Sequence, residues 1–266
     1  MGIEDYLYHF SNTFKINPYI INMILDDQKR KKENEIISKM SFEEFQKHFN
    51  DKILASKLLG EYGYIPSMYK SLDDEDEIKK VILSDGTEEQ IMAILFKDEE
   101  DVQSTIKKLD TLDSLKYVKM YFDGFKKQYE IKDYTAAAFY LSSILDNRFR
   151  FLFRKKDYVT ISRFLNEGIE NIKVEHFNKL SENERPLLSN VFLLAEFIPA
   201  LISYISRLFD GDKNAKEHFG KAKYEPSYLE RNWLVHGFRT KPVKQYEVLQ
   251  LLNAIDVLEE IIIMLK

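Results

Sequence analysis

Apolar residues recur every three or four positions along most of this chain, the spacing of one face of an α-helix. A clear example runs through Phe45, Phe49, Ile53 and Leu58. The chain has only six prolines and nine glycines in 266 residues, which favours long helices over short strands joined by tight turns. The pattern therefore predicts an all-α protein.

Two helix starts are marked by capping boxes, in which a hydroxyl and a carboxylate or amide three residues later satisfy each other's backbone N–H groups. Ser41 with Glu44 opens a predicted helix that runs to Leu58, and Thr87 with Gln90 opens another. The stretch from Asp110 to Glu130 is also amphipathic, and we expect it to be helical.

The C-terminal half has the stronger pattern. Long helices are predicted over 133–153, 158–172, 186–209 and 243–265, with Pro199 expected to kink or break the third. A short helix is predicted to start at Pro226 and Ser227, with Ser227 and Glu230 as its capping box, and to end at Gly237. The last helix has one inward stripe, formed by Tyr246, Leu249, Leu252, Ile255, Leu258, Ile262 and Leu265.

These elements suggest two helical lobes with a boundary near residue 130. Residues 1–129 form an N-terminal helical domain in which no motif indicates a chemistry. Residues 130–266 form a second helical domain that contains the candidate site.

Composition narrows the class of protein. Hydrophobic residues make up 44% of the chain and charged residues 31%, which is typical of a folded globular protein. The absence of cysteine excludes disulfides, thiolate nucleophiles and cysteine metal sites. The apolar run 191–209 is interrupted by Glu196, Pro199 and Arg207, so we expect a core helix and not a membrane span. A cytoplasmic protein without a membrane partner is predicted.

Charge is unevenly distributed. The formal net charge of −5 argues against a general binder of polyanions. Between Gly211 and Lys244, however, eight basic residues face four acidic ones, an excess of four positive charges. A solvated surface and a binding surface both explain this excess.

This basic segment contains the sequence Glu230-Arg231-Asn232-Trp233-Leu234-Val235-His236-Gly237. A guanidinium presents a planar fork of donors that fits phosphate oxygens, and a histidine near neutral pKa exchanges protons at physiological pH. Together they suit attack of an RNA 2′-hydroxyl on the adjacent phosphodiester, a reaction that needs no metal and that DNA cannot undergo. No grouping of histidines and carboxylates with metal-ligand spacing accompanies them.

The geometry of this stretch leaves a structural alternative open. Residues five apart on an ideal helix point about 140° apart, so Arg231 and His236 share no face unless the helix end unwinds or two chains pair. In the alternative, Arg231 forms a surface ion pair and His236 caps the helix before the Gly237 turn. Trp233 is predicted to be a core anchor of the motif helix.

The Arg231-Asn232-x-x-x-His236-Gly237 sequence resembles the R-x4–6-H signature of the HEPN superfamily, with Asn232 as the polar residue that follows the arginine. The layout of a long helix, an apolar helix, the motif helix and a closing helix resembles these proteins as well. The resemblance covers residues 130–266 and implies a HEPN-like antiparallel helical bundle.

The resemblance implies a metal-independent endoribonuclease without a cofactor, acting as a homodimer in phage defence or a toxin-like stress response. Arg231, His236 and Asn232 take the catalytic positions, and Asp146 on the earlier helix is a possible supporting acid. Lys221, Lys223, Arg239 and Lys241 are the candidates for RNA contacts, and an antitoxin or sensor protein is a possible partner. The alternative is a non-catalytic HEPN-like module that binds RNA, a nucleotide or a protein.

Overall fold

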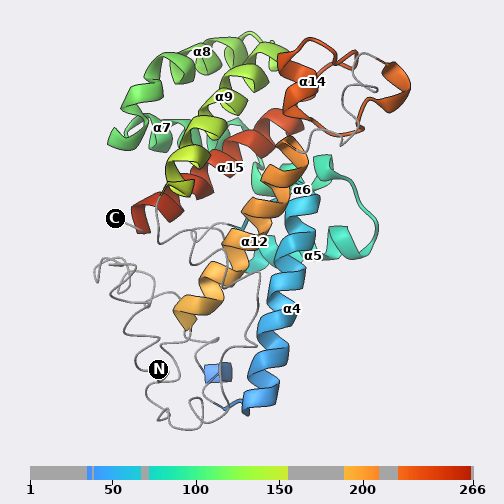
Figure 1. Ribbon diagram of the computed structural model, residues 1–266, viewed down its shortest axis with the longest axis vertical. Helices are drawn as coiled ribbons and strands as arrows, with labels where there is room; N and C mark the ends of the chain where they lie inside the picture. The colour runs from blue at the N-terminus through green and yellow to red at the C-terminus, as the bar shows by residue number, and fades with distance from the viewer. Residues whose placement is uncertain (1–34, 38, 67–71, 155–188, 210–220, 265–266) are drawn as a thin grey trace.

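The computed structural model describes residues 35–37, 39–66, 72–154, 189–209 and 221–264 (Figure 1). Every regular element among them is a helix, as the hydrophobic spacing predicts. The first half comprises α4 (Phe42–Glu61), α5 (Leu72–Leu83), α6 (Glu88–Leu95), α7 (Glu99–Asp110), the 3₁₀ helix η1 (Asp113–Val118) and α8 (Lys119–Glu130). The second half comprises α9 (Tyr134–Phe153), α12 (Ser189–Phe209), the 3₁₀ helix η4 (Ala222–Tyr224), α14 (Arg231–Val235) and α15 (Gln245–Met264).

Most predicted helix boundaries within these residues are close to the observed ones. Two of the three predicted capping boxes form, Ser41 with Glu44 and Thr87 with Gln90. The stretch 110–130 is split, because η1 precedes α8. The helix predicted over 158–172 lies outside the described residues. Each helix of the described part is too short or too polar to span a lipid bilayer.

Helices α4 and α12 lie side by side along much of their length (Figure 1). Small residues allow the close approach: a Cβ added to Gly60 would lie 2.2 Å from the carbonyl oxygen of Ala200. Pro199 was expected to kink or break this helix, and the break does not occur, since α12 continues through Pro199. The backbone N–H of Ala200, the next residue, donates to Ser56 Oγ on α4 at 2.9 Å. A polar contact between helices thus forms beside the proline, where the helix backbone lacks an N–H.

Helix α15 lies in the middle of the described helices, against α9, α6, α7 and α12 (Figure 1). The prediction of one inward stripe is wrong, because α15 is buried nearly all round. The buried positions outside the predicted stripe include Val248, Leu251, Ala254, Val257 and Ile261. The acidic residues that made the helix look two-sided are covered by the rest of the chain.

The acids of α15 are paired with cations from other elements. Glu259 binds Arg148 of α9, with 1% and 7% of the two side chains exposed, and also accepts from Ser114 Oγ at 2.6 Å. Lys108 of α7 lies 2.8 Å from both Asp256 and Glu260. Burial lowers the pKa of Lys108, but the two carboxylates more than offset this, and its pKa is raised overall. These ion pairs let a charged helix occupy the interior.

One hydrophobic cluster joins residues from both sides of position 130. Helix α4 packs on α12, and α6 and α7 pack on α15, so helices of the predicted N-terminal domain contact helices of the predicted C-terminal one. Asn253 of α15 adds a polar link: its side chain accepts from the N–H of Ile65 and donates to the carbonyl of Ile65, both at 3.2 Å. The division into two domains stays a prediction from the sequence.

Candidate functional site

The motif helix is shorter than predicted and begins at Arg231, not at Pro226. Its N-cap is Glu230, whose carboxylate accepts from the N–H groups of Asn232 (3.1 Å) and Trp233 (2.8 Å). The predicted capping box of Ser227 with Glu230 is therefore wrong. Glu230 is 1% exposed, and burial raises its pKa by more than the two N–H groups and Arg231 lower it.

The other end of α14 is closed as the sequence predicts. Gly237 has a φ of +69°, and its N–H donates to the carbonyl of Leu234 at 3.2 Å. The N–H of Phe238 donates to the carbonyl of Trp233 at 2.9 Å. This pair of bonds is a Schellman motif, which favours glycine at the left-handed position. His236 is the C-cap, and its side chain is exposed.

The side chain of Arg231, the first residue of α14, lies near Asp146 of α9 and Phe209 of α12. Its Nη2 is 3.8 Å from Oδ2 of Asp146, its Nη1 donates to Oδ1 of Asn232 at 3.3 Å, and its guanidinium carbon is 5.9 Å from the centre of the Phe209 ring. The side chain is 27% exposed. Its buried Nε has no hydrogen-bond acceptor among the described residues. The guanidinium is thus oriented by its neighbours but loosely paired.

Asp146 divides its carboxylate between two arginines. One oxygen accepts from Arg150 Nε at 2.8 Å, one turn along α9, and the other faces Arg231. Arg150 is 72% exposed, whereas Asp146 is 23% exposed. The structure therefore brings the sequence-predicted Asp146, Arg231 and Asn232 together. Arg150 is part of the same cluster, although sequence reasoning did not select it.

His236 has different neighbours from Arg231. Its ring centre lies 6.3 Å from that of Phe238, which is 37% exposed and in turn meets the Trp233 ring edge-on at 6.4 Å. Trp233 is 3% exposed, which agrees with its prediction as a core anchor. Arg231 is the first residue of α14 and His236 is its C-cap, so the two residues lie at opposite ends of a helix of about one and a half turns.

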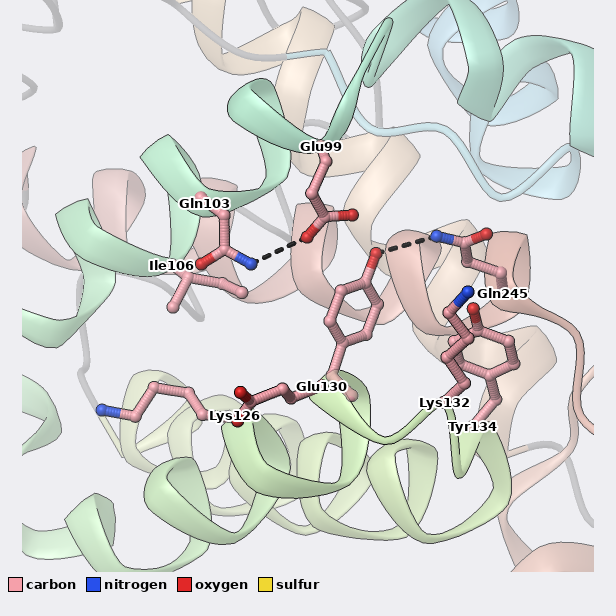
Figure 2. A pocket seen from close by; sticks show the side chains of 9 residues that line it. Glu99, Gln103, Ile106, Lys126, Glu130, Lys132, Tyr134 and Gln245 are labelled. Atoms are coloured by element: carbon pink, nitrogen blue, oxygen red, sulfur yellow. Dashed lines mark hydrogen bonds between the residues drawn. The ribbon is translucent and has the colours of Figure 1, made fainter.

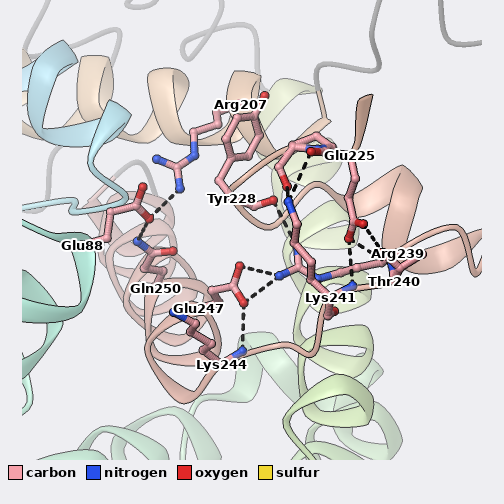
Figure 3. Close-up of polar contacts among 11 residues, drawn as sticks. Glu88, Arg207, Glu225, Tyr228, Arg239, Thr240, Lys241, Lys244, Glu247 and Gln250 are labelled. Atoms are coloured by element: carbon pink, nitrogen blue, oxygen red, sulfur yellow. Dashed lines mark hydrogen bonds and ion pairs between the residues drawn. The ribbon is translucent and has the colours of Figure 1, made fainter. Parts of the chain in front are cut away.

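The basic residues after the motif differ in their surroundings (Figure 3). Arg239 is 7% exposed and donates to both oxygens of Glu247, at 2.8 and 2.9 Å, and to the carbonyls of Tyr228 and Lys241. Arg239, predicted to contact RNA, is thus built into the interior. Lys241 Nζ lies near the carbonyls of Glu225 and Pro226 at an exposed position. Lys221 and Lys223 are exposed on the preceding segment.

Glu225 joins the two segments that flank α14 (Figure 3). Its carboxylate accepts from the N–H groups of Thr240 and Lys241, both at 3.0 Å, and from the Thr240 hydroxyl. Nearby, Glu88 of α6 accepts at 2.7 Å from both Arg207 of α12 and Gln250 of α15. The two segments that flank α14 are therefore joined to each other through Glu225, and Arg239 joins the second segment to α15 through Glu247.

A separate cavity of about 720 Å³ lies between α7, α8 and the start of α15 (Figure 2). Gln245 donates to the Tyr129 hydroxyl at 2.9 Å, and Gln103 donates to Glu99 at 2.7 Å. Burial, followed by the charge of Glu99, raises the pKa of Tyr129. The first of these hydrogen bonds joins α15 to α8, and the second lies within α7. The described residues that line the cavity include no histidine or arginine, so it does not share the chemistry of the motif.

Among the described residues, no three histidine, aspartate or glutamate side chains are grouped so as to hold a metal ion. Comparisons with models of protein families, with curated proteins and with solved structures find no match to this chain.

Proposed function

We propose that this protein is a HEPN-type endoribonuclease that cleaves RNA by attack of the 2′-hydroxyl, leaving 2′,3′-cyclic phosphate ends. In this proposal it acts in phage defence or a toxin-like stress response. The observation that carries the proposal is the cluster of Arg231, Asn232 and Asp146, with His236 exposed at the other end of the same short helix.

Each residue has a role that fits its surroundings. Arg231 keeps donors for the phosphate, because its ion pair with Asp146 is long and its side chain remains partly exposed. Asn232 and Asp146 orient the guanidinium. His236 transfers protons to or from the reacting oxygens, which requires an exposed imidazole.

The separation of Arg231 and His236 within one chain makes a homodimer part of the proposal. Pairing two copies across the motif face would set Arg231 of one chain near His236 of the other. The resemblance to HEPN proteins supports this arrangement. The non-catalytic RNA-binding, nucleotide-binding or protein-binding module is the alternative, favoured by the different surroundings of the two residues in one chain.

The test is cleavage of a 5′-labelled unstructured RNA in EDTA, beside the same sequence as DNA. We expect cyclic phosphate ends from RNA and no cleavage of DNA. The His236→Ala and Arg231→Ala variants should each lose about 100-fold or more in rate, since general acid–base catalysis and charge stabilisation contribute at least that much. His48→Ala on α4 is the matched control and should cleave normally.

Two outcomes would redirect the proposal. Absence of cleavage across several RNAs would favour the binding module. Cleavage unchanged in both variants would mean that Arg231 and His236 are not the catalytic residues. Mixing the two inactive variants tests the dimer: composite sites should restore up to about a quarter of the activity in randomly paired chains. No restoration would place the whole site within one chain.

A further inference from the structure

The last turns of α9 carry the sequence Asp146-Asn147-Arg148-Phe149-Arg150-Phe151-Leu152-Phe153-Arg154, in which three arginines alternate with aromatic residues. The structure separates the arginines by direction. Arg148 points inward to Glu259, whereas Arg150 and Arg154 are exposed. Arg148 therefore belongs to the core, and the other two remain on the surface.

The exposed arginines lie in line with the candidate site. Asp146, Arg150 and Arg154 are four residues apart, so they follow one face of α9 with a rise of about 6 Å between them. Arg154 keeps helical backbone angles as the C-cap, which extends the line. Asp146 contacts Arg231, so a row of guanidiniums leads from Arg231 to Arg150 and then to Arg154.

This row has an excess of positive charge. Three guanidiniums face one carboxylate, and Arg150 keeps donors beyond its bond to Asp146 because only its Nε is engaged there. Phe151 follows Arg150 in sequence and is 39% exposed, and the guanidinium carbon of Arg148 lies 4.8 Å from the centre of its ring. Cations at regular steps with an exposed aromatic ring are the features by which proteins follow the backbone of a single nucleic-acid strand.

We propose that the strand of RNA entering the candidate site runs along α9, with Arg150 and Arg154 binding the phosphates next to the one held by Arg231. This inference rests on the proposed function. It moves the RNA path away from the loop around Arg239, whose guanidinium is occupied by Glu247.

The experiment measures binding without cleavage, using wild-type protein and a labelled single-stranded 2′-O-methyl RNA that has no 2′-hydroxyl to attack. Fluorescence anisotropy over a series of salt concentrations gives the affinity and its salt dependence. Arg150→Ala/Arg154→Ala should weaken binding about tenfold or more. It should also reduce the slope of log K against log salt by roughly 1.4, about 0.7 for each phosphate contact on a single strand.

Lys221→Ala/Lys223→Ala also removes two exposed positive charges, and it tests the competing RNA contacts that the sequence predicts before the motif. It should weaken binding much less if the strand follows α9. An equal or larger effect from the lysine pair would overturn the inference, as would absence of binding by the wild type. Arg150→Lys/Arg154→Lys keeps the charge and should retain most of the salt slope.

Arg154→Ala alone checks the path without changing a partner of Asp146, and it should reduce affinity by itself. Cleavage of ordinary RNA is measured separately. If wild-type protein binds through α9 but does not cleave, the path stands and the proposed ribonuclease falls. If the wild-type protein cleaves RNA and the α9 variants bind normally, the proposed ribonuclease stands and the path along α9 falls.

Discussion

The charged side chains of helices α15 and α14 differ in how deeply they are buried and how closely they are paired. The acids of α15 are mostly buried and lie within hydrogen-bonding distance of a cation from another element, as in the pairs of Glu259 with Arg148 and Glu247 with Arg239. In α14, Arg231 is partly exposed, lies 3.8 Å from Asp146 and leaves its Nε unbonded among the described residues, and the C-cap His236 is exposed. A charge that is buried and fully paired supports the fold, whereas a loosely paired one near solvent is available to a ligand.

Arg231 and Arg239, eight residues apart in the motif segment, show the same difference in burial and pairing. Arg239 is 7% exposed with its donors on Glu247 and two carbonyls, and Arg231 is 27% exposed. From the sequence, Arg231 was predicted to be catalytic and Arg239 to contact RNA. Three predictions, ordered from the largest expected effect to the smallest, test whether burial and pairing separate structural from functional charges.

Glu259→Ala should have the largest effect, lowering the free energy of unfolding by about 3–5 kcal/mol because it leaves Arg148 buried without its partner. Urea denaturation measures it. Asp146→Ala, which removes the partner of Arg231 and Arg150, should cost less than about 1 kcal/mol, since exposed ion pairs contribute little. Similar losses of stability in the two variants would mean that burial does not separate the charges of α15 from those around α14.

Arg239→Ala should come next, at about 2–3 kcal/mol, because Glu247 would lose its bidentate partner while 2% exposed. Lys241→Ala, at an exposed position two residues on, should stay within about 0.5 kcal/mol. The measurement is again urea denaturation. Full stability of the Arg239 variant, with reduced RNA binding, would instead assign Arg239 to the site.

Glu230 should give the smallest effect, visible as a pH dependence. Its folded-state pKa is raised above 4.5, so above that pH and below the raised value the folded chain keeps a proton that the unfolded chain releases. Its contribution to stability is fully present below pH 4.5 and is lost as the pH rises through the folded pKa. The wild type should therefore gain stability relative to Glu230→Gln as the pH falls from about 7 toward 4.5.

Thermal or urea unfolding of both proteins over that pH range checks this sign. A constant difference between them would mean that Glu230 titrates alike in the folded and unfolded chain. The opposite trend would mean that the carboxylate is stabilised by its backbone N–H partners more than burial penalises it.

Local patterns in the sequence were enough to predict the helical class, most of the helix boundaries in the described residues and the turn at Gly237. These depend on local physics: the spacing of apolar residues, a hydroxyl with a carboxylate three residues later, and a left-handed position that favours glycine. The sequence also placed Arg231, Asn232 and His236 on one short segment.

Which charged side chains are buried depends on tertiary contacts. Arg148 and Glu259 are 111 residues apart, so no local pattern showed that they pair or that α15 is covered on all sides. The start of α14 escaped prediction for a similar reason, because Glu230 caps the helix from a buried position that the packed loop provides. Burial depends on what the rest of the chain brings near, and it makes Arg239 structural while Arg231 stays within reach of solvent.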